Sequence, residues 1–209
     1  MATTTPNYGW TVPTSTDLVK DGATAIETLG DAIDASMNTA LGTKKAGMVL
    51  LNTTSFSGVS SVSLPANTFS STYRNYKIVV NWTVSNDSYL QGRLRASGSD
   101  NSTSNYGSAL MFQSLTGGNP TGDTNASATQ TSWTKMAYGL ASNDNSATFD
   151  IYQPQISGKT FGIGNQSRSD AVFIYAGLLF QATTQFDSMT FIAGVGTISG
   201  SVNTYGYNI

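Results

Sequence analysis

The side chains available for acid–base chemistry in this chain are carboxylates, because the sequence contains no histidine and no cysteine. A glycosidase needs two carboxyl groups held about 5–9.5 Å apart. Glu27 is the single glutamate and lies in a helical pattern. Most aspartates beyond residue 43 lie in Gly-, Ser- and Asn-rich stretches, where Asp usually serves turn geometry: Asp87, Asp100, Asp123, Asp144, Asp170 and Asp187. The exception is Asp150, which stands between Phe149 and Ile151 and is expected on the outer face of a strand. Without the commonest general base, this pattern predicts that the protein is not an enzyme.

Oxygen ligands for a calcium ion could come from the runs Asn143-Asp144-Asn145 and Asp100-Asn101. The spacing of an EF-hand is absent, and such runs are common in plain turns. We therefore expect no metal and no cofactor.

Binding chemistry is better supported than catalysis. Two long polar connections, 97–107 and 116–130, are flanked by aromatic rings, and rings beside amides and hydroxyls can hold a sugar by stacking and hydrogen bonding. The candidate receptor-binding residues are Asp100, Tyr106, Asn119, Asp123 and Trp133. The alternative interpretation is that the two rings cover the rim of the core.

Composition and charge argue against nucleic acid and membranes as partners. The net charge is −2 and the densest basic cluster is the pair Lys44-Lys45, so a nucleic-acid footprint is missing. No apolar run reaches the ~20 residues of a membrane span, and the N-terminus lacks the pattern of a signal peptide. Charged residues make up 11% of the chain against about 25% in typical domains, so Ser, Thr, Asn and Gly must provide solubility.

Residues 1–15 are expected to form an extended arm, since Pro13 holds Val12 in an extended conformation and the Tyr-Gly-Trp cluster opposes a helix. Such an arm has no core of its own. It either packs back on the head or docks on another protein, with these residues as anchors: Tyr8, Trp10, Val12 and Pro13.

Residues 16–42 are expected to form a helix with apolar residues close to a heptad spacing. Two glycines weaken this helix by roughly 1 kcal/mol each relative to alanine. The helix therefore either packs on its own domain or pairs with copies in other subunits. The seam consists of Val19, Ile26, Leu29 and Ile33, continued by Met37 and Ala40.

From residue 43 to 209 the period is two. In the runs 76–84 and 90–96 the even positions are mostly apolar and the odd positions mostly polar, and the short link Ser85–Ser88 predicts that the two runs form a hairpin with one wet face. Further short strands with turn signals between them predict an antiparallel β-sandwich head.

The run 171–180 breaks this alternation, because it is apolar on both faces. Its second face must be covered, either by a neighbouring subunit or by a loop of the same chain.

Both ends of the chain resemble one class of protein. The stretch from Pro6 to Ala23 (PNYGWTVPTSTDLVKDGA) resembles the N-terminus of tailed-phage minor structural and fibre-like proteins, where it precedes unrelated C-terminal domains. The stretch from Gly196 to Asn208 (GTISGSVNTYGYN) resembles the last strand of jelly-roll heads on phage fibres, and Tyr73–Ile78 fits the same heads.

The resemblance implies a homotrimeric fibre-type component of a phage particle. Its N-terminal arm would attach to another virion protein, its helix would form a trimeric coiled coil, and its jelly-roll-like head would bind a saccharide on the host surface. Two alternatives remain: a capsid head fibre or decoration protein without a receptor role, and a glycan depolymerase, which the missing histidines and unpaired carboxylates disfavour.

Overall fold

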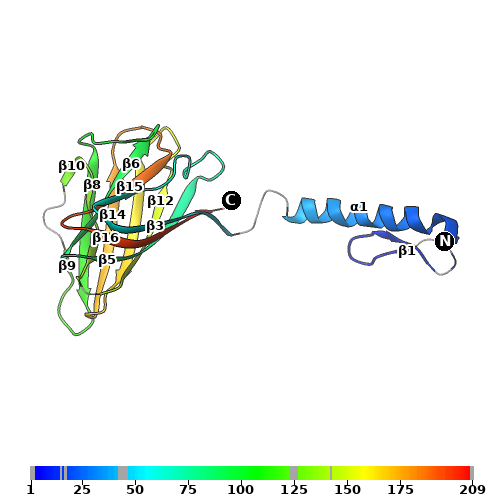
Figure 1. Cartoon of the computed structure of the whole chain (residues 1–209), viewed down its shortest axis with the longest axis horizontal. Coiled ribbons are helices and arrows are strands. Elements are labelled where there is room, and N and C mark those ends of the chain that lie inside the picture. The colour runs from blue at the N-terminus through cyan, green and yellow to red at the C-terminus, as the bar shows by residue number, and fades with distance from the viewer. Residues whose placement is uncertain are drawn as a thin grey trace. The chain divides into compact units, whose positions relative to one another are not determined.

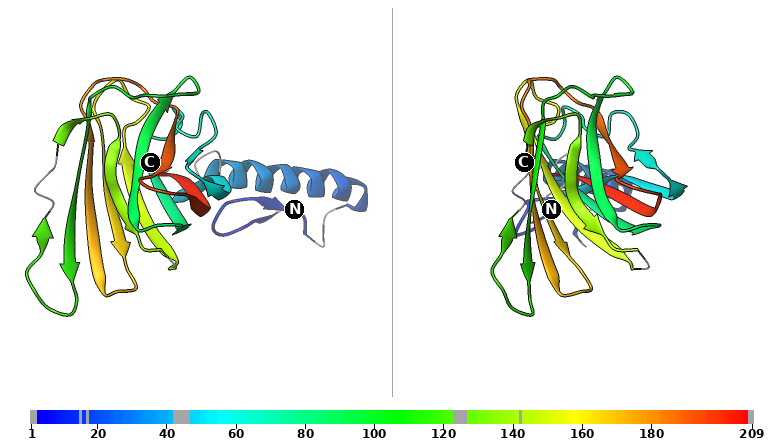
Figure 2. Two further views of the ribbon diagram at one scale, coloured as in Figure 1. Left: turned by 60° about the vertical axis from the view of Figure 1, so that its left-hand side comes forward. Right: turned by 90° about the vertical axis from the view of Figure 1, so that its left-hand side faces the viewer.

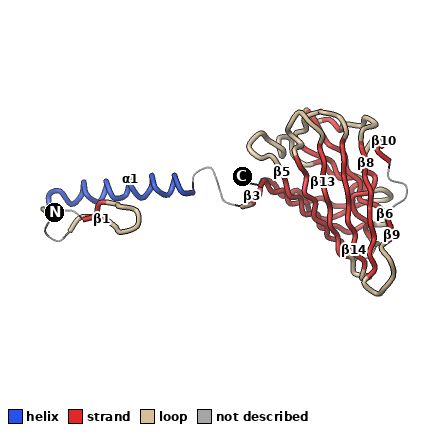
Figure 3. Tube along the Cα trace, turned by 180° about the vertical axis from the view of Figure 1, so that it is seen from behind, coloured by secondary structure: helices blue, strands red, loops and turns tan. Residues whose placement is uncertain are grey.

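The computed structural model describes residues 3–14, 16, 18–41, 47–122, 127–141 and 143–207. The chain divides into two compact units, with the boundary between Gly47 and Met48 rather than at residue 43. Figure 1 shows that the helix belongs to the N-terminal unit, and Figure 3 shows that the long strands belong to the C-terminal unit, the head. Each unit is described by itself.

The N-terminal unit begins with a small β-hairpin. Strands β1 (Thr3–Thr4) and β2 (Thr11–Val12) pair antiparallel. The turn between them is closed by a hydrogen bond from Gly9 N to Thr5 O of 3.0 Å, and Gly9 has a φ of +66°, which glycine adopts without steric strain. The indole of Trp10 donates to Ser36 Oγ of the helix at 2.8 Å. The expectation of an extended arm is therefore wrong: the segment folds back and contacts the helix.

The helix is one element of 20 residues, α1 (Gly22–Leu41), preceded by a 3-10 turn, η1 (Val19–Asp21). Of the predicted seam, Leu29 and Ile33 are half-buried. In contrast, Val19, Ile26 and Met37 are 97%, 65% and 52% exposed, so an apolar stripe of the helix is uncovered in the single chain.

The head consists of two antiparallel sheets, which the right-hand view of Figure 2 shows as separate layers. Within the described residues the large sheet has the order β10 (Ser127–Gln130), β8 (Tyr106–Ser114), β14 (Val172–Phe180), β13 (Thr160–Ser167), β12 (Asn145–Tyr152), β5 (Asn75–Val84), β16 (Ile198–Tyr207), β3 (Met48–Val59), with β9 (Thr121–Gly122) paired to β8. The small sheet has the order β11 (Trp133–Gly139), β6 (Ser88–Ala96), β15 (Ser188–Ala193), β4 (Ser61–Ser63), with β7 (Ser99–Asp100) paired to β6.

The predicted fold class, a mainly β chain with one helix and an antiparallel β-sandwich, is confirmed. The predicted hairpin between 76–84 and 90–96 is wrong. Strand β5 pairs with β12 and β16 in the large sheet, whereas β6 pairs with β15 and β11 in the small one. The link 85–87 therefore crosses between layers. Each of these two strands has one apolar face. When the two sheets stack, the apolar faces are buried against each other and form the core of the sandwich.

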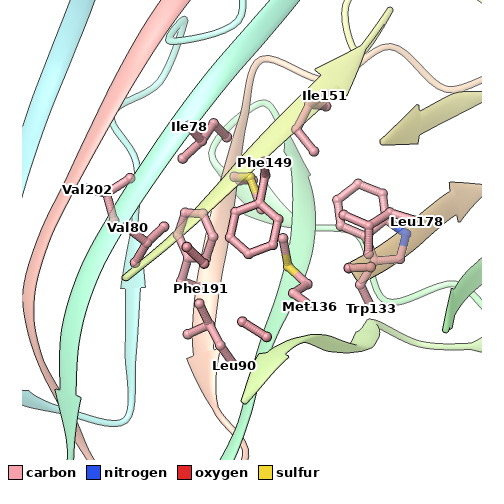
Figure 4. Close-up of a cluster of buried hydrophobic side chains, with 14 of the residues drawn as sticks. Ile78, Val80, Leu90, Trp133, Met136, Phe149, Ile151, Leu178, Phe191 and Val202 are labelled. Atoms are coloured by element: carbon pink, nitrogen blue, oxygen red, sulfur yellow. The ribbon is translucent and has the colours of Figure 1, made fainter. Parts of the chain in front are cut away.

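The core lies between the two sheets. Strand β5 contributes its even positions, among them Tyr76, Ile78 and Val80, all with no exposed surface. Figure 4 shows Ile78 and Val80 in one cluster with Phe149 of β12 and with Met136 and Phe191 of the small sheet. Trp82, at 2% exposed, also faces inward as the alternation predicts.

Candidate functional site

The two rings proposed to bind a saccharide, Tyr106 and Trp133, are fully buried. They pack edge to face with their centroids 5.7 Å apart, and Trp133 Nε1 donates to Leu179 O at 2.9 Å. Tyr106 Oη accepts from Leu94 N at 3.0 Å and donates to Asn101 O at 2.9 Å. Burial raises the pKa of Tyr106. Their assignment to a receptor site is therefore wrong, because a ring without exposed surface cannot stack on a ligand.

The described polar candidates, Asp100 and Asn119, lie in different environments. Asp100 is half-buried and accepts hydrogen bonds from the Arg95 guanidinium and from Thr190 Oγ1, so its carboxylate supports the small sheet. Asn119 is exposed in the loop after β8. Asp123 lies outside the described residues.

The run Asn143-Asp144-Asn145, considered for calcium, forms a turn before β12. The Asn145 side chain closes this turn: its Nδ2 donates to Leu140 O and Asn143 O, and its Oδ1 accepts from Leu140 N at 3.0 Å. Among the described residues no group of three or more acidic, histidine or cysteine side chains could hold a metal ion.

No helix in the described part of the chain is long and apolar enough to cross a membrane.

One broad surface remains: the face of the large sheet that points away from the small sheet, here called the outer face. It is built by the odd positions of β5 and by the residues paired with them, because neighbouring strands in register place their partners on the same face. One row across the sheet joins Asn81 to Ser146 on β12 and to Ser201 on β16. The next row joins Val79 to Thr148, Asn165 and Tyr175 on β5, β12, β13 and β14.

These rows line two adjoining hollows that share Ser146, called the Ser146 hollows below. The first has a volume of about 400 Å³ and is lined by side chains and backbone of Asn81, Trp82, Thr83, Asp144, Asn145, Ser146, Ser199, Gly200 and Ser201. The second has about 360 Å³ and is lined by Ser146, Ala147, Thr148, Asn165, Gln166, Ser167, Phe173, Ile174 and Tyr175. Both are open to solvent along the outer face.

The chemistry of the Ser146 hollows is that of hydroxyls and amides. Within the described residues, the side chains of Asn81, Ser146 and Asn165 make no hydrogen bond to protein, so their donors and acceptors are available to a ligand. Asp144 supplies the one carboxylate of the lining, and Tyr175 supplies a ring that is 47% exposed. Such a surface can hydrogen-bond a neutral polyhydroxylated ligand and stack against its apolar face.

A local feature shapes the floor of the first hollow. At Gly200 the φ is +152°, and a Cβ there would lie 2.0 Å from Asn81 O. Glycine at this position therefore lets β16 pair closely with β5, and on its other side the pairing of β16 with β3 has a bulge between Ile198 and Gly200.

Beside the Ser146 hollows, the outer face carries an ion pair that a tyrosine hydroxyl supports by a hydrogen bond. Lys77 Nζ lies 3.4 Å from Asp150 Oδ1, and the Tyr207 hydroxyl donates to the same carboxylate. Desolvation and the hydrogen bond to Asp150 raise the pKa of Tyr207. Asp150, expected on the outer side of a strand, lies there, but its carboxylate is already engaged.

The proposed anchors lie on the N-terminal unit in different environments. Tyr8 is 69% exposed and stacks on Trp10 with a centroid separation of 5.1 Å. Trp10 is half-buried and bonded to Ser36, so it stabilises the unit itself. Val12 is half-buried and Pro13 exposed. An exposed side chain for docking is therefore available at Tyr8 and Pro13.

No protein-family model matches this sequence, and no curated protein is significantly similar to it.

Proposed function

We propose that the chain is a fibre-type structural component of a tailed-phage particle, attached through its N-terminal unit, whose head binds a saccharide of the host surface without hydrolysing it. The observation that carries the binding role is the pair of Ser146 hollows, where uncommitted hydroxyl and amide groups surround an exposed ring. The virion role rests on the resemblance of residues 6–23 to phage attachment segments.

The head forms a homotrimer in this proposal. Two surfaces of the single chain support it: the exposed stripe of α1, with Ile26 65% exposed, and the outward positions of β13, where Phe161 and Ile163 are 42% and 48% exposed. The outer side of β14 was expected to need a cover; its ring Tyr175 is 47% exposed in the single chain, and in this proposal it is left open to the ligand. Three heads on one fibre would raise the apparent affinity for a repeating polysaccharide by avidity.

The outer face also supports a second candidate, a capsid decoration protein, because apolar side chains such as Phe161 and Ile163 are exposed on it and suit contacts with a protein shell. The two functions differ in what the Ser146 hollows do. If the protein decorates the capsid, particles with altered hollows should adsorb normally. If its head binds the receptor, the same particles should adsorb more slowly.

Adsorption of particles to host cells tests the proposal. Asn81→Ala removes an amide from the first hollow, and Tyr175→Ala removes the ring of the second. Each should slow adsorption by about tenfold, equivalent to roughly 1.4 kcal/mol. Asn119→Ala is the matched control, since it removes the same amide from an exposed loop outside the hollows. Unchanged adsorption of the first two variants, with normal incorporation into particles, would favour the decoration protein.

A further inference from the structure

Exposed large apolar side chains are concentrated on the outer face. Fourteen such residues are exposed in the described chain, and six of them lie on this face: Met48, Leu50, Met111, Phe161, Ile163 and Tyr175. Single exposed apolar residues are ordinary, but a contiguous group marks an interaction surface.

Tyr175 lines the second hollow and Met111 is paired with it, whereas the other four residues lie in two rows outside the hollows. Strand register places one row through Leu50, Tyr205, Lys77, Asp150 and Ile163. A second row, one step further from the hollows, passes through Met48 and Tyr207, then Asn75, Tyr152 and Phe161. We call these two rows the aromatic band. The rings of Tyr152 and Phe161, on the neighbouring strands β12 and β13, lie 5.4 Å apart.

The charges inside the aromatic band are neutralised by one another. Lys77 and Asp150 pair at 3.4 Å with side chains only 27% and 17% exposed, and Tyr207 adds a hydrogen bond. A protein surface can therefore cover the band without burying an unpaired charge, which would be strongly unfavourable. The band also carries no net charge that would select an oppositely charged partner.

The position of the band in the chain indicates a second copy as the occupant. The band begins at Met48, the first residue of the head, and only residues 42–47 separate it from the end of α1. Seven peptide steps span at most about 25 Å. Val19 in η1 and Ile26 and Ile33 in α1 recur every seven residues, the spacing at which helices of different copies pack together. Copies joined by α1 would thus hold their bands within reach of one another.

The areas agree with this assignment. Five strands about 4.8 Å apart and two rows about 7 Å apart give the band a flat area of about 340 Å². An α1 stripe about 30 Å long and about 10 Å wide adds about 300 Å². The sum approaches the roughly 800 Å² per partner of a stable interface, which neither surface reaches alone.

We propose that the aromatic bands of associated copies face one another around a common axis, leaving the Ser146 hollows open. This proposal rests on the oligomer of the proposed function, but not on saccharide binding. Because the chain has no cysteine, single introduced thiols report on coverage of the surface. Ile163→Cys lies in the band, and Asn165→Cys is its matched control, two residues along the same strand and on the same face.

The experiment measures the rate of thiol labelling in the full chain at micromolar concentration, with the oligomeric mass determined by light scattering. We expect an oligomer in which Ile163→Cys reacts at least tenfold more slowly than Asn165→Cys, although Ile163 is 48% exposed in the single copy. Equal, fast rates, or a monomeric chain, would overturn the interface. Protection of both thiols would show that the interface also covers the Ser146 hollows, which would overturn the proposal that they stay open. Loss of saccharide binding with Ile163→Cys still protected would instead contradict only the proposed function.

Discussion

The two buried tryptophans of the head provide a matched test of how it is packed. Trp133 Nε1 donates to Leu179 O at 2.9 Å, whereas Trp82 Nε1 is buried with no hydrogen-bond partner among the described residues. Replacement by phenylalanine removes the N–H and part of the ring at both sites. The lost volume costs about 1–2 kcal/mol at each.

The two N–H groups then act in opposite directions. At Trp133 the lost hydrogen bond, which leaves the Leu179 carbonyl without this partner, adds about 1–2 kcal/mol. At Trp82 the removal of an unpaired N–H relieves a penalty of about 1–2 kcal/mol and offsets the lost volume. We therefore expect Trp133→Phe to be about 2–4 kcal/mol less stable than the parent and Trp82→Phe to be within about 1 kcal/mol of it.

Denaturant unfolding of the head, followed in parallel by calorimetry, measures this difference. For a unit of this size each kcal/mol shifts Tm by about 2–4 °C, so the midpoints of the two variants should differ by about 5–10 °C. Equal losses at both sites, or a smaller loss at Trp133, would refute the assignment of Trp133 as a hydrogen-bonded core residue. Trp82→Ala, which deletes the whole ring, should still cost about 3–5 kcal/mol.

Three further predictions concern other parts of the chain. Gly200→Ala should destabilise the head by about 3 kcal/mol or more in urea unfolding, because its Cβ would meet Asn81 O, whereas Gly177→Ala, with open space around it, should change stability by less than about 0.5 kcal/mol. Burial raises the pKa of Tyr106 in the folded head above its value in the unfolded chain. The contribution of this group to stability should therefore be constant below pH ~10 and fall above it, because the unfolded chain loses the proton first. Tyr106→Phe should be about 1–3 kcal/mol less stable than the parent at pH 7, and its stability should decline less steeply at alkaline pH. Ser36→Ala should speed hydrogen exchange of the Trp10 indole N–H, observed by NMR, and leave the thermal midpoint of the head unchanged.

Alternation along single strands predicted much of the head. The inward positions of β5, including Tyr76 and Trp82, follow from the sequence, because a period of two separates apolar from polar faces. Which sheet a strand joins does not follow from this period. The expectation of a β5–β6 hairpin failed for that reason, since short links suit a crossing between layers as well as a hairpin.

The candidate site could not be predicted from local pattern. Asn81, Ser146 and Ser201 become neighbours only through strand register, and each one alone is an ordinary polar residue on a wet face. The prediction that Tyr106 and Trp133 bind a ligand failed because each is the first residue of a strand beside a long loop. At such a position a ring can turn toward solvent or close the end of the core, and here both do the latter.

NMR titration of the labelled chain with an oligosaccharide from the host surface tests saccharide binding at the Ser146 hollows. Binding there predicts shift changes that saturate at Asn81, Ser146, Asn165 and Tyr175, with resonances of the loop around Asn119 and of the small sheet unchanged. Changes confined to the loop after β8, or no changes with saccharides to which the intact particle adsorbs, would contradict it.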